Sequence, residues 1–190
     1  MKKYKSLIIL LLCACLTGCA SIPEPSEKVT TLVYGNVNFE FTNQTNANLL
    51  PESDVLQNGV EVAIQNRKTR KKYYMRTNQY GEFYHANVPA GPYRLCSVKK
   101  NITGNGNEYL FGGELKERGA DNYNFQILDN YANNVGVITL KIEMNNVYQY
   151  TWYLSWAWDY KAAQETFWEK HWESDWLYKE WRNTDDYYQR

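Results

Sequence analysis

One short stretch of the sequence gathers side chains that could bind a metal ion or transfer protons. Glu165, Glu169, Glu173 and Asp175 lie close together near the C-terminus, with His171 among them. Carboxylates and imidazoles are common metal ligands and general acids or bases. At 100° per residue on an α-helix, however, the three glutamates share one side and His171 projects away from it. We therefore interpret the group as a solvated acidic face and predict no metal site.

The rest of the chain contains no motif that supports catalysis or cofactor binding. The HExxH, CxxC and GxSxG patterns are absent, and no glycine-rich loop stands between a strand and a helix in the way that phosphate binding requires. The glycine-rich stretch Gly104–Gly113 is therefore interpreted as a loop. The sequence predicts a protein that is not an enzyme and needs no cofactor.

The tryptophans are the most unusual feature of the sequence, because all seven lie in its last third. Trp168, Trp172 and Trp176 recur every four residues, and Trp181 follows. This spacing predicts a helix from Tyr160 to Trp181, with Asp159 as its N-cap and two aromatic stripes on its surface. One stripe would pack on the protein and leave the other as a candidate binding surface.

Four ligands fit such a surface: a partner protein, a second copy of the chain, a carbohydrate or a lipid interface. A helix that lies in a membrane interface usually carries lysine and arginine on its polar face. This helix is acidic, so its direct insertion into a membrane is disfavoured. Sequence alone does not separate the remaining alternatives, because a buried tryptophan ladder has the same spacing as an exposed one.

The first residues resemble the export signal of bacterial lipoproteins. Lys2, Lys3 and Lys5 precede an apolar run that is too short to span a bilayer. The sequence "LTGC", residues 16–19, resembles the lipobox of that family. The resemblance implies that residues 1–18 are removed and that Cys19 carries a diacylglyceryl group and a further acyl chain such as palmitate. Several acyl chains give stable membrane anchoring, whereas one alone is marginal.

Processing at this site changes the charge and the cysteine content of the protein. Removal of the three lysines leaves 18 basic and 21 acidic residues, a net charge of −3, which gives no support for nucleic-acid binding. Cys96 then remains as the only cysteine without lipid, and we expect it to be buried and inert. Residues 19–30 are interpreted as the lipidated cysteine and a polar tether. Because Ala20 is not aspartate, the enterobacterial sorting rule implies the outer membrane for a Gram-negative host.

Residues 31–158 show the alternation of apolar and polar side chains that is typical of half-buried strands. It is clearest in residues 32–41, 59–65, 71–77, 81–88, 92–98, 122–128 and 136–144, which are separated by turn signals. Short strands at regular spacing predict one antiparallel β-sandwich domain. Residues 159–190 form the tryptophan-rich helical tail.

Part of this region is similar to a known family. Gly59–Leu95 resembles the carboxypeptidase regulatory-like and Cna-B-like domains, which have a transthyretin-type sandwich. The positions that match the family's pattern are Thr77, Asn78, Gly81, Phe83, Val88, Pro89, Gly91, Tyr93 and Leu95. Asn133–Leu140 resembles a late strand of the same family. The resemblance implies a structural or binding module.

Two special properties of relatives are not expected here. Hydroxyisourate hydrolases of this type need several histidines and a Tyr-Arg-Gly-Ser terminus, but this chain has only His85 and His171 and ends in "DDYYQR". The Lys–Asn isopeptide bond of some Cna-B domains uses a lysine in the first strand, and the predicted first strand has none.

A basic hairpin is a second candidate for a binding surface. Residues 66–76 contain six basic residues and no acidic one. These charges could protect a sheet edge from unwanted pairing. They could also contact anionic lipid or an acidic partner, or pair with the acidic tail.

The sequence therefore predicts a lipid-anchored, non-catalytic protein of the cell envelope that acts as a structural or protein-binding module. The alternative is a carbohydrate-binding surface lipoprotein. Trp168, Trp172, Trp176 and Trp181 are the candidate binding residues, and Cys19 is the lipidation site.

Overall fold

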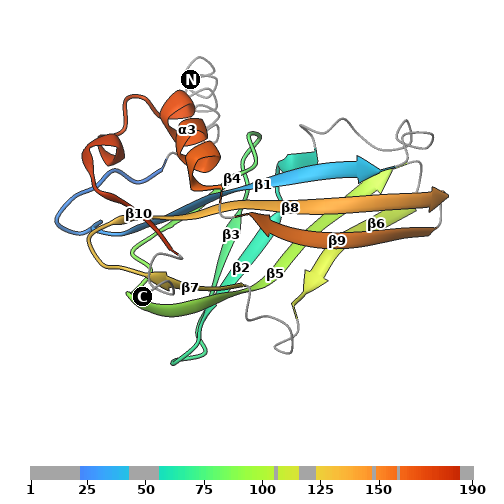
Figure 1. The fold of residues 1–190 in the computed structure, drawn as a ribbon, viewed down its shortest axis with the longest axis horizontal. Helices are drawn as coiled ribbons and strands as arrows, with labels where there is room; N and C mark the ends of the chain where they lie inside the picture. Colours follow the sequence, from blue (N-terminus) through green and yellow to red (C-terminus); the bar gives the residue numbers. More distant parts are fainter. Residues whose placement is uncertain are drawn as a thin grey trace, which may run out of the picture.

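The computed structural model of the protein describes residues 22–42, 56–104, 107–115, 123–146, 149–157 and 159–184. Two five-stranded sheets make up most of this structure, and a helix follows them near the C-terminus (Figure 1). The prediction of a mainly β chain with a C-terminal helix is confirmed. The assignment to the transthyretin type remains a prediction.

The first sheet is built around a parallel pair of long strands. β1 (Leu32–Thr42) lies beside β8 (Ala132–Asn146), and β4 (Glu82–Ala86) pairs antiparallel with the other edge of β1. β9 (Gln149–Ala157) and the short β10 (Trp181–Asn183) also pair with β8. This sheet therefore joins the first described strand to the last one. The prediction of an antiparallel sandwich is wrong for this sheet, because β1 and β10 both run parallel to β8.

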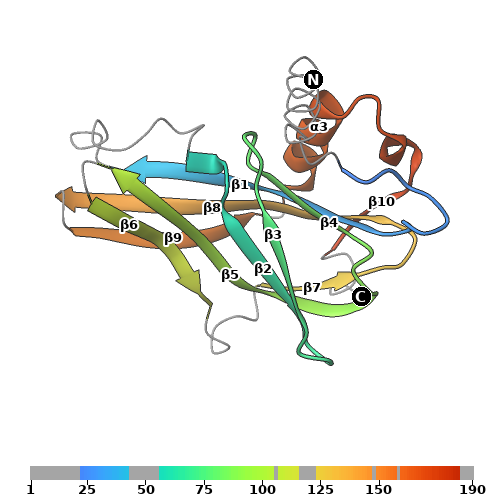
Figure 2. The ribbon, with the colours of Figure 1, turned by 180° about the vertical axis from the view of Figure 1, so that it is seen from behind.

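The second sheet has the order β3, β2, β5 and β6, and all of its pairs are antiparallel. Its strands are β2 (Glu61–Asn66), β3 (Lys72–Arg76), β5 (Gly91–Gly104), β6 (Asn107–Glu114) and β7 (Asn124–Ile127). β7 pairs with the start of β5. Figure 2 shows β3, β2 and β5 running side by side across the face of the molecule that is turned away in Figure 1.

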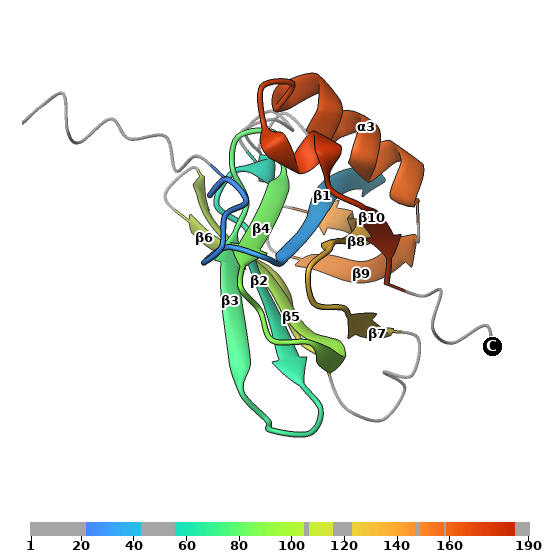
Figure 3. The same ribbon diagram turned by 90° about the vertical axis from the view of Figure 1, so that its left-hand side faces the viewer.

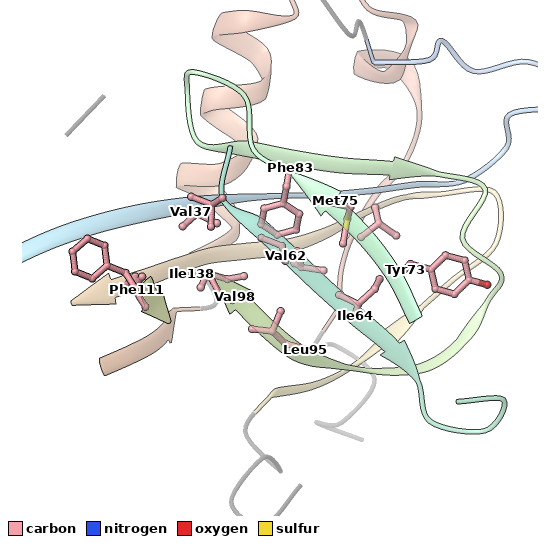
Figure 4. Packing of buried hydrophobic residues seen from close by; sticks show 14 of the residues in the cluster. Val37, Val62, Ile64, Tyr73, Met75, Phe83, Leu95, Val98, Phe111 and Ile138 are labelled. Carbon is pink, nitrogen blue, oxygen red and sulfur yellow. The ribbon is translucent and has the colours of Figure 1, made fainter. Parts of the chain in front are cut away.

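The core lies between the two sheets, as the alternation in the sequence predicts. In β3, for example, Tyr73 and Met75 are buried whereas Tyr74 is exposed. Figure 4 shows side chains from the two sheets meeting in this core, among them Val37 and Ile138 from one sheet and Val62 and Leu95 from the other. Burial of these apolar side chains is the main stabilising contribution to such a sandwich.

The interpretation of the glycine-rich stretch as a loop is wrong. The glycine-rich stretch Gly104–Gly113 is not a loop, because it contains most of β6 in a hairpin with β5. Tyr109 and Phe111 are buried in the core, and Leu110 between them is exposed. Gly112 has φ +80°, and a Cβ atom there would lie 2.0 Å from the carbonyl oxygen of Val98. Glycine is required at that position for close strand packing, not for a loop.

A bulge in β8 places β9 and β10 on the same edge of that strand. The register between β1 and β8 shifts by one residue between Tyr34 and Asn36, where Val135 and Gly136 occupy the bulge. Gly136 has φ +77°, and its N–H donates to the side chain of Asn134. β10 pairs with β8 before the bulge and β9 pairs with it after the bulge.

The outer face of the first sheet carries a second, smaller core. Leu32 and Tyr34 of β1 point to this side, where helix α3 (Tyr160–Lys170) and the 3₁₀ helix η3 (Asp175–Tyr178) cover them. Figure 3 shows α3 lying over β1 and β8, on the opposite side from the second sheet. Among the residues that the structure describes, no helix is long and apolar enough to cross a membrane.

Residues 22–30 do not extend freely from the domain as a tether would. Ile22 is buried in the second core. The N–H of Thr30 donates to the side chain of Asn87, and the Asn87 amide donates to the carbonyl of Lys28. The described part of the expected tether is therefore packed against the protein.

Candidate functional site

The C-terminal segment, which we define as residues 159–184, begins with a capped helix that packs on the first sheet. The Asp159 carboxylate accepts a hydrogen bond from the N–H of Ala162 at 3.0 Å, as the N-cap prediction requires. Ala163 and Phe167 form the buried face of α3. The Phe167 ring meets the Tyr34 ring edge-on at a centroid distance of 5.1 Å, which ties the helix to β1.

The helix ends earlier than the tryptophan spacing predicts. α3 stops at Lys170, and His171 turns the chain while its N–H donates to the carbonyl of Phe167. Ser174 then begins η3, where its hydroxyl accepts from the N–H of Trp176. The predicted helix from Tyr160 to Trp181 is therefore wrong beyond Lys170. Trp168, Trp172 and Trp176 do not lie on one helical stripe.

Two of the four candidate binding tryptophans are part of the second core. The Trp176 side chain is fully buried, and its indole N–H donates to the carbonyl of Pro23 at 2.7 Å. Trp181 is half-buried, and its indole N–H donates to the carbonyl of Trp176. Its ring packs on Phe167 at 4.8 Å. These two residues hold the segment in place.

The other two candidate tryptophans are at the surface. Trp168 is 48% exposed and Trp172 is 69% exposed, and Tyr178 of η3 is 87% exposed. Single exposed aromatic residues are common, but these three are exposed within one ordered segment of the sequence, which makes them candidate contact residues. We call Trp168, Trp172 and Tyr178 the aromatic surface.

A buried carboxylate connects the C-terminal segment to the first sheet. Glu82 of β4 is fully buried. It accepts hydrogen bonds from the Tyr34 hydroxyl at 2.8 Å, the Asn78 amide at 2.6 Å and the His171 imidazole at 3.0 Å. Polar groups at this depth are stable only when they are paired in this way.

The hydrogen bonds determine how these groups ionise. Burial alone would raise the pKa of Glu82, but the hydrogen bonds from His171, Asn78 and Tyr34 outweigh it and lower the pKa below its ordinary value. Burial, followed by the charge of Glu82, raises the pKa of the Tyr34 phenol. Glu82 is thus a buried anion in the folded protein, and it accepts hydrogen bonds from three side chains.

The acidic residues of the segment do not converge on a metal site. Glu165 pairs with Lys161 and Glu169 pairs with Lys170, while His171 is turned towards Glu82. Within the described ranges, no group of three or more histidine, cysteine, aspartate or glutamate side chains could hold a metal ion.

Two hollows open beside the end of α3. The first, which we call the Trp172 hollow, has a volume of about 380 Å³ and is lined by Ile22, Glu24, Lys170, His171, Trp172, Glu173, Ser174 and Asp175. The second, the Tyr80 hollow, has a volume of about 610 Å³ and is lined by Gln57, Asn58, Gln79, Tyr80, Thr166, Glu169 and Lys170. Lys170 lines both, and its ammonium lies 5.1 Å from the centre of the Tyr80 ring.

The contribution of the N-terminal residues to this region was not predicted from the sequence. Ile22 and Glu24 line the Trp172 hollow. The Glu24 carboxylate accepts from the Ser174 hydroxyl at 3.0 Å and from the N–H of Asp175 at 2.8 Å. These contacts join residues 150 positions apart, so no local pattern could indicate them.

The remaining sequence predictions have different outcomes. The expectation that Cys96 is buried is confirmed, and burial raises the pKa of its thiol. Cys19, the predicted lipidation site, lies outside the described residues. The basic hairpin formed by β2 and β3 points away from α3 (Figures 1 and 3).

Comparison with known proteins gives only distant likenesses. No protein-family model matches the sequence, and no curated protein matches it. A leucine-rich repeat protein from Bacteroides thetaiotaomicron is similar in structure over 73% of this chain, at 16% identity and a TM-score of 0.36. This match spans only 16% of the other protein's length.

A second solved structure is that of a protein from Pseudomonas aeruginosa, named as a candidate carbohydrate-binding protein. It matches 64% of this chain and 99% of its own, at 12% identity and a TM-score of 0.32. At these TM-scores, neither structure is evidence for the family or the ligand of this protein.

Proposed function

We propose that this protein is a non-catalytic, lipid-anchored module of the cell envelope that binds a partner protein through its aromatic surface. The observation that carries the proposal is the exposure of Trp168, Trp172 and Tyr178 on a segment that is held in place by buried Phe167 and by the hydrogen-bonded indoles of Trp176 and Trp181. Aromatic side chains have few rotatable bonds, so they lose little conformational entropy on binding, and they are enriched where proteins meet.

The non-catalytic part of the proposal rests on the state of the polar side chains near this surface. Glu82 is closed off from solvent by Tyr34, Asn78 and His171. The Ser174 hydroxyl donates to Glu24, so it is not paired with His171 as a nucleophile paired with a base would be. These groups hold the segment in place and do not present a reacting atom.

The anchor and the fold family rest on the sequence. The lipobox-like residues 16–19 support acylation of Cys19 and, with Ala20, location in the outer membrane. The matching positions between Gly59 and Leu95 support a transthyretin-type sandwich of the carboxypeptidase regulatory-like kind. Such a domain would serve as the scaffold that presents the aromatic surface.

Site-specific photo-crosslinking in intact cells tests the protein-binding proposal. A photoreactive amino acid at Trp168 is expected to give a discrete crosslinked product with one protein. The control position is Lys161, which lies on the same helix with a side chain that is 85% exposed. The proposal is contradicted if position 168 gives no product, or if both positions give the same products.

Carbohydrate binding is the second candidate function, because the two hollows combine aromatic rings with polar groups. Trp172 lies beside the carboxylates of Glu24 and Asp175, and Tyr80 lies beside the amides of Gln57 and Gln79. Sugars are commonly bound by flat rings with polar side chains around them.

Titration of the soluble Cys19→Ser protein with a glycan panel tests carbohydrate binding, and it should change the tryptophan fluorescence of the protein. The absence of any change would exclude this function for the sugars tested.

A further inference from the structure

The structure leaves little free chain between the predicted lipid anchor and the folded domain. Ile22 is only 4% exposed, and Pro23 accepts a hydrogen bond from the indole of Trp176. Glu24 accepts two further hydrogen bonds from the turn that begins η3. The chain is therefore fixed to the C-terminal segment from Ile22 onward.

This arrangement limits how far the domain can lie from a membrane. Cys19 precedes Ile22 by three residues. Three residues span at most about 11 Å even when they are fully extended. The polar head-group layer on each side of a bilayer is roughly 5–7 Å thick. A lipid on Cys19 would thus hold the surface around Ile22 at the head groups.

Trp172 lies at the part of the surface that such an anchor brings to the membrane. It lines the same hollow as Ile22, and it is more exposed than the other described tryptophans. Tryptophan prefers the membrane–water interface, because its ring is apolar and its N–H can meet polar groups. The ring follows the end of α3, so its contact with lipid does not require the acidic side of the helix to enter the membrane.

We propose that Trp172 and the rim of the Trp172 hollow insert into the lipid head-group layer and fix the orientation of the domain on the membrane. This inference rests on the lipid anchor of the proposed function. In this orientation Trp172 of the aromatic surface contacts lipid, so the partner protein of the proposed function binds through the other two residues of that surface, Trp168 and Tyr178.

The charges around the hollow indicate which lipids suit this contact. Glu24, Glu173 and Asp175 are acidic, whereas Lys170 and His171 are the basic residues that line the hollow, and His171 is paired with the buried Glu82. Lys170 is also paired with Glu169 at 2.6 Å. Anionic lipids would be repelled by this surface, so the contact should be made with zwitterionic head groups and should depend mainly on the aromatic ring.

The orientation also determines what faces away from the membrane. The tip of the basic β2–β3 hairpin lies on the opposite side of the molecule from α3 (Figures 1 and 3). Arg67, Lys68 and Arg70 near this tip are exposed. In this orientation they are held away from the lipid that anchors the protein.

Fluorescence quenching of the lipidated protein in phosphatidylcholine vesicles tests the inference. Lipids with brominated acyl chains should quench part of the tryptophan emission. Trp172→Phe should remove most of that quenching, whereas the control Trp168→Phe should retain it. Ten Gly/Ser residues inserted between Ala20 and Ser21 should also abolish the quenching, because the domain is then released from the surface.

The outcomes separate this inference from the anchor on which it rests. If wild-type protein is absent from the membrane fraction of cells, the lipid anchor fails. If the protein is in that fraction but Trp172→Phe leaves the quenching unchanged, the docking of Trp172 is wrong and the anchor stands. Equal quenching with and without the inserted residues would also contradict the docking. Stronger quenching in vesicles rich in phosphatidylglycerol would contradict the proposed charge preference.

Discussion

At the scale of single residues, two tryptophans four positions apart have opposite environments. Trp176 is fully buried with its indole N–H bonded to Pro23, whereas Trp172 is 69% exposed at the rim of a hollow. Their spacing in the sequence is that of one helical face, but α3 ends at Lys170, before Trp172, and Trp176 lies in the separate helix η3. The same residue type therefore stabilises the fold at one position and forms a surface at the other.

Substitution of each tryptophan by alanine should separate these two roles. Trp176→Ala removes a buried ring and leaves a cavity, so it should lower the free energy of unfolding by about 3–5 kcal/mol. Trp172→Ala should change that free energy by about 0.5 kcal/mol or less, because the ring is mostly in solvent. Urea denaturation of the two variants measures both values. Similar losses of stability for the two would contradict this assignment.

Glu82 should make the stability of the protein sensitive to acid. Its pKa is lowered in the folded state, so its ionised form stabilises the protein fully above its ordinary value of 4.5. That contribution is lost as the pH falls through the folded-state pKa, which lies below 4.5. The difference in unfolding free energy between the wild type and Glu82→Gln should therefore shrink as the pH is lowered from 5 to 3. A difference that does not depend on pH would contradict a buried, ionised Glu82.

At the scale of elements, alternation in the sequence predicts most of the strands because each one buries alternate side chains in the core. The features that it misses depend on other signals. The glycines of β6 favour its interpretation as a loop, although the alternating Tyr109 and Phe111 indicate a strand. The tryptophan spacing predicts a helix that is longer than α3. Ser174, a typical N-cap residue, indicates instead that a new helix begins after it.

The packing of residues 22–24 could not be predicted in the same way. Ile22, Pro23 and Glu24 contact the turn and the helix that begin 150 positions later, and the segment itself looks like a polar linker. Contacts of this kind depend on the final fold and leave no local periodicity. For this reason the sequence indicated four candidate tryptophans, but not which of them are exposed, and not the hollow that Trp172 lines together with the N-terminal residues.

The strand assignment of residues 107–114 predicts a strong difference between two adjacent glycines. Gly112→Ala would place a side chain at φ +80° and against the Val98 backbone, so it should destabilise the protein by at least about 1–3 kcal/mol. Gly113→Ala is the matched control, because a Cβ there meets only the Trp152 ring, at 3.2 Å. Thermal unfolding followed by circular dichroism compares the two. Equal, small shifts in the midpoint would contradict the hairpin.

At the scale of the whole molecule, the N-terminal residues, the C-terminal segment and the first sheet form one unit. β10 pairs with β8, Trp176 bonds to Pro23, and His171 bonds to Glu82 of β4. Helix α3 of this unit lies on one side of the sandwich, and the basic hairpin points to the other (Figure 3). A lipid on Cys19 would therefore give the molecule a defined membrane side and a defined outer side.

Mass spectrometry of the mature protein, purified from the membrane fraction of its host, tests the central claim of a lipid anchor most directly. We predict that the mature chain begins at Cys19 and carries a diacylglyceryl group together with a further acyl chain. Cys19→Ser should lack this mass and should leave the membrane fraction. A mature chain that retains residues 1–18, or that carries an unmodified Cys19, would contradict the account.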